Sequence, residues 1–322
     1  MLRVGLVGIG GMGTVHYNEY KKIDTASVVA VADVRVDMAK EKIGDDNVNV
    51  YADMEALLSN EQVDMIDICT PSYLHAELAI KALQAGVHVI CEKPMSINKE
   101  DCEKVIKVAS QSGKLFMTAH VVRFMSAYEY LKNIIDTKEL GAPVHFDMKR
   151  ISTIPRWSFE DWMRDITKSG ASPIDLSIHD IDFIQYVFGE PKKISAVRKT
   201  MTNDNDYIVS ELIYDDFDVN ITGGWFNCDI PFRAQYLAIF ENGYVEYVNG
   251  KIIKNGQEIE LKKREDSKID GINISGADGY YDEIVYFIDC INKGVKPDKV
   301  TPESSKNSVS LVKKICESAD II

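Results

Sequence analysis

The chain has 322 residues and a formal net charge of −13, from 37 lysines and arginines against 50 aspartates and glutamates. This acidic balance argues against a nucleic-acid partner, which needs a basic patch. No apolar run approaches the ~20 residues that span a bilayer, so we expect no membrane partner either. Six cysteines without a CxxC pair, and an N-terminus without a signal-peptide cleavage site, favour a cytoplasmic protein with reduced thiols.

The first 120 or so residues alternate between two patterns. Strand-like runs fall at 2–8, 27–33, 63–69, 87–92 and 114–120, and helical patterns at 12–22, 36–43, 53–59, 73–85 and 98–112. Near-continuous apolar strands separated by amphipathic helices are typical of a parallel sheet with helices on both faces. We therefore predict an α/β protein whose N-terminal domain, 1–121, is a Rossmann dinucleotide-binding domain.

The pattern changes after about residue 122. Helices are predicted at 126–139, 173–188, 278–293 and 302–319, and strands at 144–153, 192–200, 206–214, 217–226 and 233–240. Residues 244–261 form a predicted hairpin with the strong turn signal Asn-Gly at 249–250 and 255–256, and a loop is expected at 262–276. The C-terminal domain, 122–322, is thus predicted to be α+β with a large, mostly antiparallel sheet.

The first strand runs into a glycine-rich turn, "VGLVGIGGMG". Gly8, Gly10 and Gly13 form a GxGxxG pattern that opens a helix, and Asp33 ends the next strand 20 residues past Gly13. Such glycines let the backbone approach a pyrophosphate, and Asp33 can accept from the ribose hydroxyls of an adenosine. Asp33 would repel a 2′-phosphate, so NAD is predicted and NADP is less favoured. NADP remains an alternative cofactor because Arg35 could reach such a phosphate.

Two more strand ends contribute to the predicted cofactor site, because ligands of open parallel sheets bind at the carboxyl ends of strands. In "CTPSYLH" (69–75), Thr70 and Pro71 are placed to flank the cofactor, while His75 either contacts a ribose or is an ordinary first-turn histidine. The complete predicted set is Gly8, Gly10, Gly11, Met12, Gly13, Asp33, Arg35, Thr70, Pro71, His75, Glu92 and Lys93.

The second strand end is "VHVICEKPMS" (87–96), where Glu92 and Lys93 follow an apolar run. A lysine in a partly dry pocket is a strong hydrogen-bond donor with an adjustable pKa. Pro94 fixes the chain direction directly after it. We expect Glu92 to keep Lys93 charged beside a nicotinamide; a solvent-exposed strand end is the alternative.

The predicted helix at 173–188 has one polar stripe on an otherwise apolar surface. A spacing of about 100° per residue places Asp175, His179, Asp182 and Tyr186 in this stripe. A buried unpaired charge is costly, so the stripe needs a partner, and a substrate cleft would supply one. A helix that faces water is the competing interpretation.

Four motifs together resemble the Gfo/Idh/MocA oxidoreductases, and the resemblance covers essentially the whole chain. They are "GIGGMG" at 8–13, "EKP" at 92–94, "VRF" at 122–124 and "SGASPIDLSIHDID" at 169–182. The resemblance implies that Lys93, Asp175 and His179 are active-site residues, and it favours a cis Lys93–Pro94 bond. One departure is Gly170-Ala171, where the family has two glycines.

The combined expectation is an NAD(P)-dependent dehydrogenase that moves a hydride between nicotinamide and a polyol, cyclitol or sugar. His179 would be the general base, and Lys93 would stabilise the developing alkoxide. Asp175 would orient the histidine or bind a neighbouring hydroxyl. Further pocket-lining residues, each of which could equally be packing, are Arg123, Trp162, Tyr236 and Tyr281.

Two other functions stay open: a dinucleotide-sensing regulator without turnover, and an NAD-dependent glycosidase. No metal is expected, because the six histidines form no ligand-spaced cluster. Family resemblance also implies a second-domain sheet with one open face. We expect that face to be apolar and to form a homodimer or homotetramer, with apolar residues of the predicted strands as its members: Ile208, Val209, Leu212, Ile221, Trp225 and Leu237.

Overall fold

The computed structural model describes residues 1–44, 47–261 and 279–322, so the loop predicted at 262–276 lies outside the described residues. By its internal contacts the chain divides into two compact units. The first is Met1–Val121 with Tyr280–Lys306, and the second is Val122–Gly279 with Asn307–Ile322. The predicted domains, 1–121 and 122–322, are contiguous in sequence. The units differ from them because the helix that begins at Tyr280 packs on the first helix of the chain.

The first unit contains a six-stranded parallel sheet in the order β3-β2-β1-β4-β5-β6. Its elements are β1 (Leu2–Val7), α1 (Gly11–Tyr20), β2 (Ala26–Ala32), α2 (Val36–Ile43), β3 (Asn49–Tyr51), α3 (Met54–Asn60), β4 (Met65–Ile68), η1 (Ser72–Leu74), α4 (His75–Gln84), β5 (His88–Glu92), α5 (Lys99–Ser112), β6 (Phe116–Ala119) and α9 (Tyr280–Lys293). This confirms the predicted Rossmann fold; β3 is a short strand that the sequence did not reveal.

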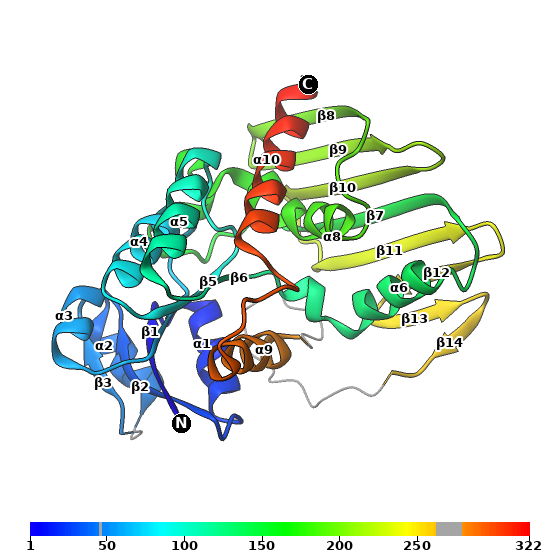
Figure 1. The fold of residues 1–322 in the computed structure, drawn as a ribbon. Coiled ribbons are helices and arrows are strands. Elements are labelled where there is room, and N and C mark those ends of the chain that lie inside the picture. Colours follow the sequence, from blue (N-terminus) through cyan, green and yellow to red (C-terminus); the bar gives the residue numbers. More distant parts are fainter. Residues whose placement is uncertain (45–46, 262–278) are drawn as a thin grey trace. The chain divides into compact units, whose positions relative to one another are not determined.

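Burial explains why these runs are strands. All four residues of β4 are buried, and so are the last four of β5, because helices cover both faces of the sheet. Crossovers between parallel strands are right-handed, so the helix that leads from β1 to β2 and the helix that leads from β4 to β5 lie on opposite faces. Figure 1 shows α4 beside α5 and α1 beside α9, in agreement with their contacts.

The second unit contains a nine-stranded sheet in the order β14-β13-β12-β11-β7-β10-β9-β8-β15 (Figure 1). Two strand pairs, β7 with β10 and β8 with β15, are parallel and the others are antiparallel, so the predicted mostly antiparallel sheet is confirmed. The strands are β7 (Pro143–Thr153), β8 (Lys193–Thr202), β9 (Asn205–Ile213), β10 (Asp218–Phe226), β11 (Arg233–Phe240), β12 (Gly243–Val248), β13 (Lys251–Lys254), β14 (Gln257–Ile259) and β15 (Ala319–Ile321).

The described helical segments outside the first unit are η2 (Val121–Phe124), α6 (Ser126–Thr137), η3 (Phe159–Arg164), α7 (Ile166–Ser169), the π-helical turn η4 (Pro173–Ser177), α8 (Ile178–Phe188) and α10 (Pro302–Ser318). Val121 of η2 and the first residues of α10 belong to the first unit. Both predicted Asn-Gly turns are confirmed: Asn249 and Gly250, and Asn255 and Gly256, all have positive φ, as a tight hairpin turn requires. None of the described helices combines the length and the apolar character needed to cross a membrane.

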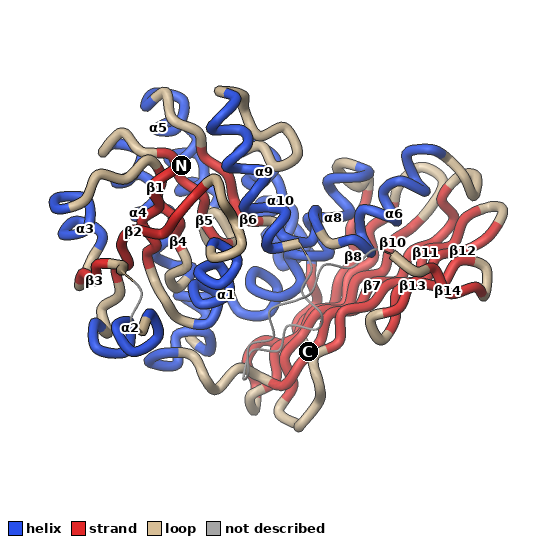
Figure 2. The backbone as a smooth tube through the Cα atoms, turned by 90° about the horizontal axis from the view of Figure 1, so that it is seen from below, coloured by secondary structure: helices blue, strands red, loops and turns tan. Residues whose placement is uncertain are grey.

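The nine-stranded sheet has one covered face, along which α6 and α8 lie (Figure 2). Most of the apolar residues that we expected on the open face are buried, so that expectation was wrong for them: Ile208, Leu212, Ile221 and Trp225. Side chains alternate between the faces of a strand, and a list of apolar residues does not say which face each one takes. Val209 and its register partner Val197 are exposed, at 42% and 37%.

Candidate active site

The glycine turn connects β1 to α1. Gly8 has φ +86°, and a Cβ there would lie 2.7 Å from the carbonyl oxygen of Cys69, while a Cβ on Gly13 would overlap the carbonyl oxygen of Gly8. These two glycines are therefore required by local packing. Gly10, the N-cap of α1, has nothing within 4 Å of the position that a Cβ would take. The turn thus leaves open space at the positive end of a helix, which fits the pyrophosphate of a dinucleotide.

Asp33 follows β2 and is almost fully buried beside this turn. Its Oδ2 accepts from the backbone N–H of Ile9 at 3.0 Å, and its Oδ1 accepts from the N–H of Arg35 at 2.9 Å. The guanidinium Nε of Arg35 lies 3.5 Å from the same Oδ1. Asp33 therefore holds the glycine turn in place and also lies beside the positive charge of Arg35.

Lys42, near the end of α2, is a residue that the sequence reading missed. Its Nζ donates to the carbonyl oxygens of Ile9 and Gly10 at 2.8 and 3.1 Å, and to Oγ1 of Thr14 at 3.0 Å. Burial and the neighbouring Arg35 lower the pKa of Lys42. A lysine in the last turn of a helix is so common that no sequence signal distinguishes this one.

His75 links the loops that follow β4 and β5. Its Nδ1 lies 2.7 Å from the carbonyl oxygen of Pro94, and its Nε2 lies 2.9 Å from the carbonyl oxygen of Thr70. The side chain is buried, and burial lowers the pKa of the imidazole. Of the two roles considered for His75, this geometry favours a structural bridge over a ribose contact. The Lys93–Pro94 bond is cis, as expected.

Glu92 has a partner that the sequence did not suggest. It is buried at the end of β5, and its Oε2 accepts from the backbone N–H of Lys93 at 3.0 Å. Its Oε1 lies 3.3 Å from Nε2 of His16, an ion-pair contact with a side chain of α1. The carboxylate is thus directed into the interior of the first unit, and it holds the main chain of Lys93.

In the second unit, Asp175 lies in the π-helical turn η4 and His179 lies in the first turn of α8. η4 packs closely on β10, because a Cβ on Gly223 would overlap the side chain of Ser177. Asp175 is buried and His179 is partly exposed. π-Helical turns are often found at functional sites. Because a π-helical turn has more residues per turn than an α-helix, the 100° per residue that we assumed for 173–188 does not hold exactly at Asp175.

Asp182, which the sequence places in the polar stripe of this helix, has a partner within the protein. It is fully buried and bonds the guanidinium of Arg123, from Nε to Oδ2 at 2.9 Å and from Nη2 to Oδ1 at 2.6 Å. Ser308 donates to Oδ1 at 2.6 Å, and Arg123 also lies 4.5 Å from the ring centroid of Tyr186. These contacts give Arg123 a role in holding α8.

A second buried ion pair holds α8 through Asp180. Arg150 of β7 donates to both oxygens of Asp180, at 3.1 and 2.8 Å. The hydroxyl of Tyr128 on α6 donates to Oδ1 at 3.0 Å. The residue that follows His179 in the sequence is therefore bonded to the sheet and to α6.

The remaining pocket-lining candidates, Tyr236, Tyr281 and Trp162, lie in different surroundings. Tyr236 is buried in the core of the second unit, and its hydroxyl donates to the carbonyl oxygen of Ala127 at 2.7 Å. Tyr281 is partly buried in the first turn of α9. Trp162 packs on a small apolar cluster formed by Ile154, Met163, Ala171, Leu176 and Trp225. The geometry makes Tyr236 a packing residue rather than a lining one.

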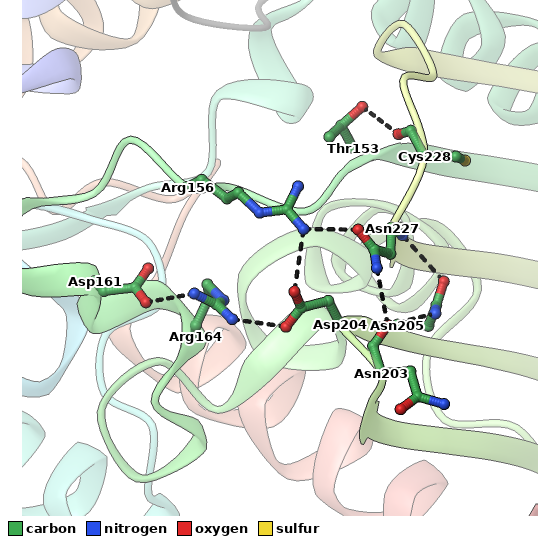
Figure 3. A network of polar contacts seen from close by, with 9 residues as sticks. All are labelled: Thr153, Arg156, Asp161, Arg164, Asn203, Asp204, Asn205, Asn227 and Cys228. Atoms are coloured by element: carbon green, nitrogen blue, oxygen red, sulfur yellow. Dashed lines mark hydrogen bonds and ion pairs between the residues drawn. The ribbon is translucent and has the colours of Figure 1, made fainter.

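A polar network supports the η3 segment that carries Trp162 (Figure 3). Asp204 lies between two arginines, 3.0 Å from Arg156 and 2.6 Å from Arg164. Arg164 also donates to Asp161 at 2.7 Å. Hydrogen bonds from both arginines lower the pKa of Asp204. The network connects the loop after β7 to the turn between β8 and β9.

Within the described residues, one group of side chains has the composition of a metal site: His16, Asp67 and Cys69, whose ligand atoms lie within 4.8 Å of one another. His16 Nδ1 and Asp67 Oδ2 are 2.8 Å apart, which is a hydrogen-bond distance. Two ligands of a tetrahedral zinc ion, each about 2.1 Å from it, are further apart than this. The arrangement is that of a hydrogen-bonded pair.

Comparison with known proteins decides the family. A family described as "Oxidoreductase family, NAD-binding Rossmann fold" matches residues 2–120, and "GFO/IDH/MocA C-terminal domain" matches residues 128–236. The chain belongs to the Gfo/Idh/MocA oxidoreductase family. The resemblance inferred from the four motifs is therefore confirmed, and the domain with the six-stranded sheet is an NAD(P)-binding Rossmann domain.

Relatives within the family have different activities. The chain is 33% identical over 192 residues to a myo-inositol 2-dehydrogenase of Thermotoga maritima (59% of this chain, 55% of the relative). It is 30% identical over 217 residues to a 2,7-anhydro-N-acetylneuraminate hydratase of Mediterraneibacter gnavus (66% and 55%). The chain thus spans about half the length of these curated relatives. The myo-inositol 2-dehydrogenase structure from Lactobacillus plantarum shares the fold, with a TM-score of 0.80 and 22% identity over 99% of this chain and 97% of that one.

Proposed function

We propose that the protein is an NAD-dependent dehydrogenase that transfers a hydride between the nicotinamide and a hydroxyl or carbonyl of a polyol, cyclitol or sugar. The observation that carries the proposal is the carboxyl edge of the six-stranded sheet. There the glycine turn leaves space over Gly10, and Lys93 follows β5 directly. The inositol dehydrogenase among the relatives supports this substrate class.

The catalytic roles follow from side-chain chemistry. When bound, the nicotinamide takes up or returns the hydride. Lys93 donates a hydrogen bond to the reacting oxygen and stabilises negative charge there. His179 accepts the proton of the hydroxyl, since an imidazole titrates near neutral pH. Asp175 orients that imidazole or binds a neighbouring hydroxyl of the substrate. The buried ion pairs of α8 keep His179 in a fixed place.

The preferred cofactor in this proposal is NAD. The Asp33 carboxylate is fixed by Ile9 and Arg35 at the end of β2, where the family fingerprint places the adenosine ribose. Its negative charge opposes a 2′-phosphate. Arg35 already faces this carboxylate at 3.5 Å, so part of its positive charge is neutralised within the protein.

A reaction without net oxidation is the second candidate, because one relative is named a hydratase. A glycosidase that oxidises its substrate only transiently would have the same overall redox balance. A regulator that binds dinucleotide without turnover is less well supported, because Lys93, Asp175 and His179 are all present.

The test is incubation of the purified chain with NAD and a panel of inositols, sugars and sugar acids. NADH is followed by absorbance, and products are identified by NMR. The proposal expects stoichiometric NADH with at least one cyclitol, polyol or sugar. A changed substrate without NADH would support the second candidate instead. NAD binding without any product would support the regulator.

We also propose that the chain forms a dimer or tetramer through the open face of the nine-stranded sheet. Val197 and Val209 are adjacent in register there and are both exposed. Light scattering at micromolar concentration should give at least twice the mass of the chain, and Val209→Asp should lower it. A monomeric wild-type protein would contradict this proposal.

A further inference from the structure

We propose that His16 is a positioning residue for Lys93 and acts through Glu92. His16 lies on α1, the helix that begins at the glycine turn, and its side chain is fully buried. Its Nε2 lies 3.3 Å from Oε1 of Glu92, while Oε2 of the same carboxylate accepts from the backbone N–H of Lys93 at 3.0 Å. One carboxylate thus connects the dinucleotide-binding helix to Lys93. The inference rests on the proposed function in treating Lys93 as catalytic.

The second ring nitrogen of His16 explains how the imidazole is held. Nδ1 lies 2.8 Å from Oδ2 of Asp67 on β4, and the hydroxyl of Tyr20 donates to the same oxygen at 3.0 Å. The ring therefore lies between two carboxylates, those of Asp67 and Glu92. Nδ1 is hydrogen-bonded to Asp67, while Nε2 reaches Glu92 as an ion-pair contact and not as a hydrogen bond. A neutral imidazole offers the two carboxylates no positive charge, whereas an imidazolium places one between them.

The charges of this group are consistent with an imidazolium. Burial opposes the charge on His16, but the carboxylate of Asp67 more than compensates, and the pKa of His16 is raised. Burial alone would raise the pKa of Glu92, but His16 and Lys93 outweigh it, and the pKa of Glu92 is lowered. Because both groups are ionised and buried, each depends on the other for compensation.

Loss of His16 would therefore change the position of Glu92. A carboxylate that is left in the core without its cation must take up a proton or turn toward water. Either change weakens the hydrogen bond that holds the N–H of Lys93 and lets the lysine move. Displacements of about 1 Å in an active site can cost about a hundredfold in rate. A purely stabilising ion pair, by contrast, would affect unfolding and leave turnover intact.

The first experiment compares His16→Gln with Tyr20→Phe. Tyr20 is a matched control, because it is buried on the same helix and donates to the same Asp67 oxygen. We expect His16→Gln to lower kcat at least about tenfold while the Kd for NAD stays within about threefold. Tyr20→Phe should leave kcat within about twofold. Equal kcat in His16→Gln and wild type, at full NAD occupancy, would overturn the inference.

The second experiment tests whether the effect passes through Glu92. Glu92→Gln should lower kcat to a similar extent, and adding His16→Gln to it should change kcat little further. If the two losses multiply instead, His16 acts by another route and the inference fails. If His16→Gln does not fold, Glu92→Gln alone decides: an unchanged kcat overturns the inference.

A third measurement does not depend on turnover. The rate at which an amine-reactive reagent modifies Lys93 in the NAD-saturated protein is read by mass spectrometry of the peptide that carries it. His16→Gln should change this rate at least about threefold, and Tyr20→Phe should not. A change in His16→Gln alone would support the positioning role even if no substrate is found. Failure of the proposed function and failure of the inference can therefore be told apart. Identical rates in all three proteins would contradict the inference.

Discussion

Arg123 and Asp182 form a buried ion pair with two hydrogen bonds, Nε to Oδ2 at 2.9 Å and Nη2 to Oδ1 at 2.6 Å. They lie 59 residues apart in sequence, and the pair fastens η2 to α8 within the second unit. Because α8 also carries His179, the pair connects the stability of this unit to the geometry of the proposed catalytic residue.

The first prediction concerns this pair. Arg123→Met leaves the Asp182 carboxylate buried without its cation, and should lower the free energy of unfolding by about 3–5 kcal/mol. Arg123→Met with Asp182→Leu removes both charges and should recover most of that loss. Urea unfolding followed by circular dichroism measures both variants. If the double variant is as unstable as the single one, packing rather than charge accounts for the loss.

The second prediction concerns the close contact between β10 and η4. A Cβ at Gly223 would overlap the side chain of Ser177, so Gly223→Ala should destabilise the protein by about 1–3 kcal/mol and displace the turn that carries Asp175. Ser177→Gly removes the atoms that clash, and in combination with Gly223→Ala it should restore part of the stability and turnover. Thermal unfolding and steady-state kinetics of the three variants test this. Absence of rescue would mean that the overlap with Ser177 is not the cause.

The third prediction concerns Glu283, which is fully buried in the first turn of α9, with neither carboxyl oxygen hydrogen-bonded to any described residue. Burial raises its pKa well above the ordinary value of 4.5. Between these two pKa values the folded state holds a proton that the unfolded state has lost, so stability falls as pH rises above about 4.5. Glu283→Gln removes the titrating group and therefore this pH-dependent loss of stability. It should stabilise the protein by on the order of 1 kcal/mol or more at pH 8, and by much less at pH 5. A pH-independent difference in urea unfolding would contradict this.

The fourth prediction concerns cofactor choice. Asp33→Ala removes the negative charge that opposes a 2′-phosphate, so it should weaken NAD binding and narrow the difference between NAD and NADP. It should also cost stability, because the N–H of Ile9 loses its acceptor. Fluorescence titration with both dinucleotides measures the effect, and a melting curve separates it from unfolding. Equal affinities for NAD and NADP in the wild type would refute the assignment.

The sequence predicted the features that depend on local periodicity and on turn chemistry. Continuous apolar strands between amphipathic helices indicated the six-stranded sheet, and the two Asn-Gly pairs marked the turns between β12 and β14. The sequence did not reveal several segments that are too short to show a periodic spacing of apolar residues, namely β3, β15, η3 and α7. The strands among them are stabilised by their neighbours in the sheet rather than by a pattern of their own.

The sequence predicted the features of the candidate site that lie within its motifs, but not the contacts that those motifs make with the rest of the chain. The open position at Gly10 and the cis bond before Pro94 were expected. The partners of Glu92 and Asp182 were not, because such pairs join side chains that are far apart in sequence and leave no spacing pattern. His16 is an example: a single histidine on a helix gives no sign that two carboxylates will face it.

The central claim is that Lys93 takes part in hydride-transfer chemistry and that NAD binding does not depend on its side chain. The most direct measurement is NADH formation by wild type and Lys93→Ala with the same polyol or cyclitol at saturating NAD, together with the Kd for NAD. Asp33 bonds the N–H groups of Ile9 and Arg35, and the glycine turn packs on Cys69, so these features should bind NAD in the variant as they do in the wild type. Its turnover should be at least about a hundredfold lower, the scale of losing one transition-state donor. Normal NAD binding with near wild-type turnover would contradict the account.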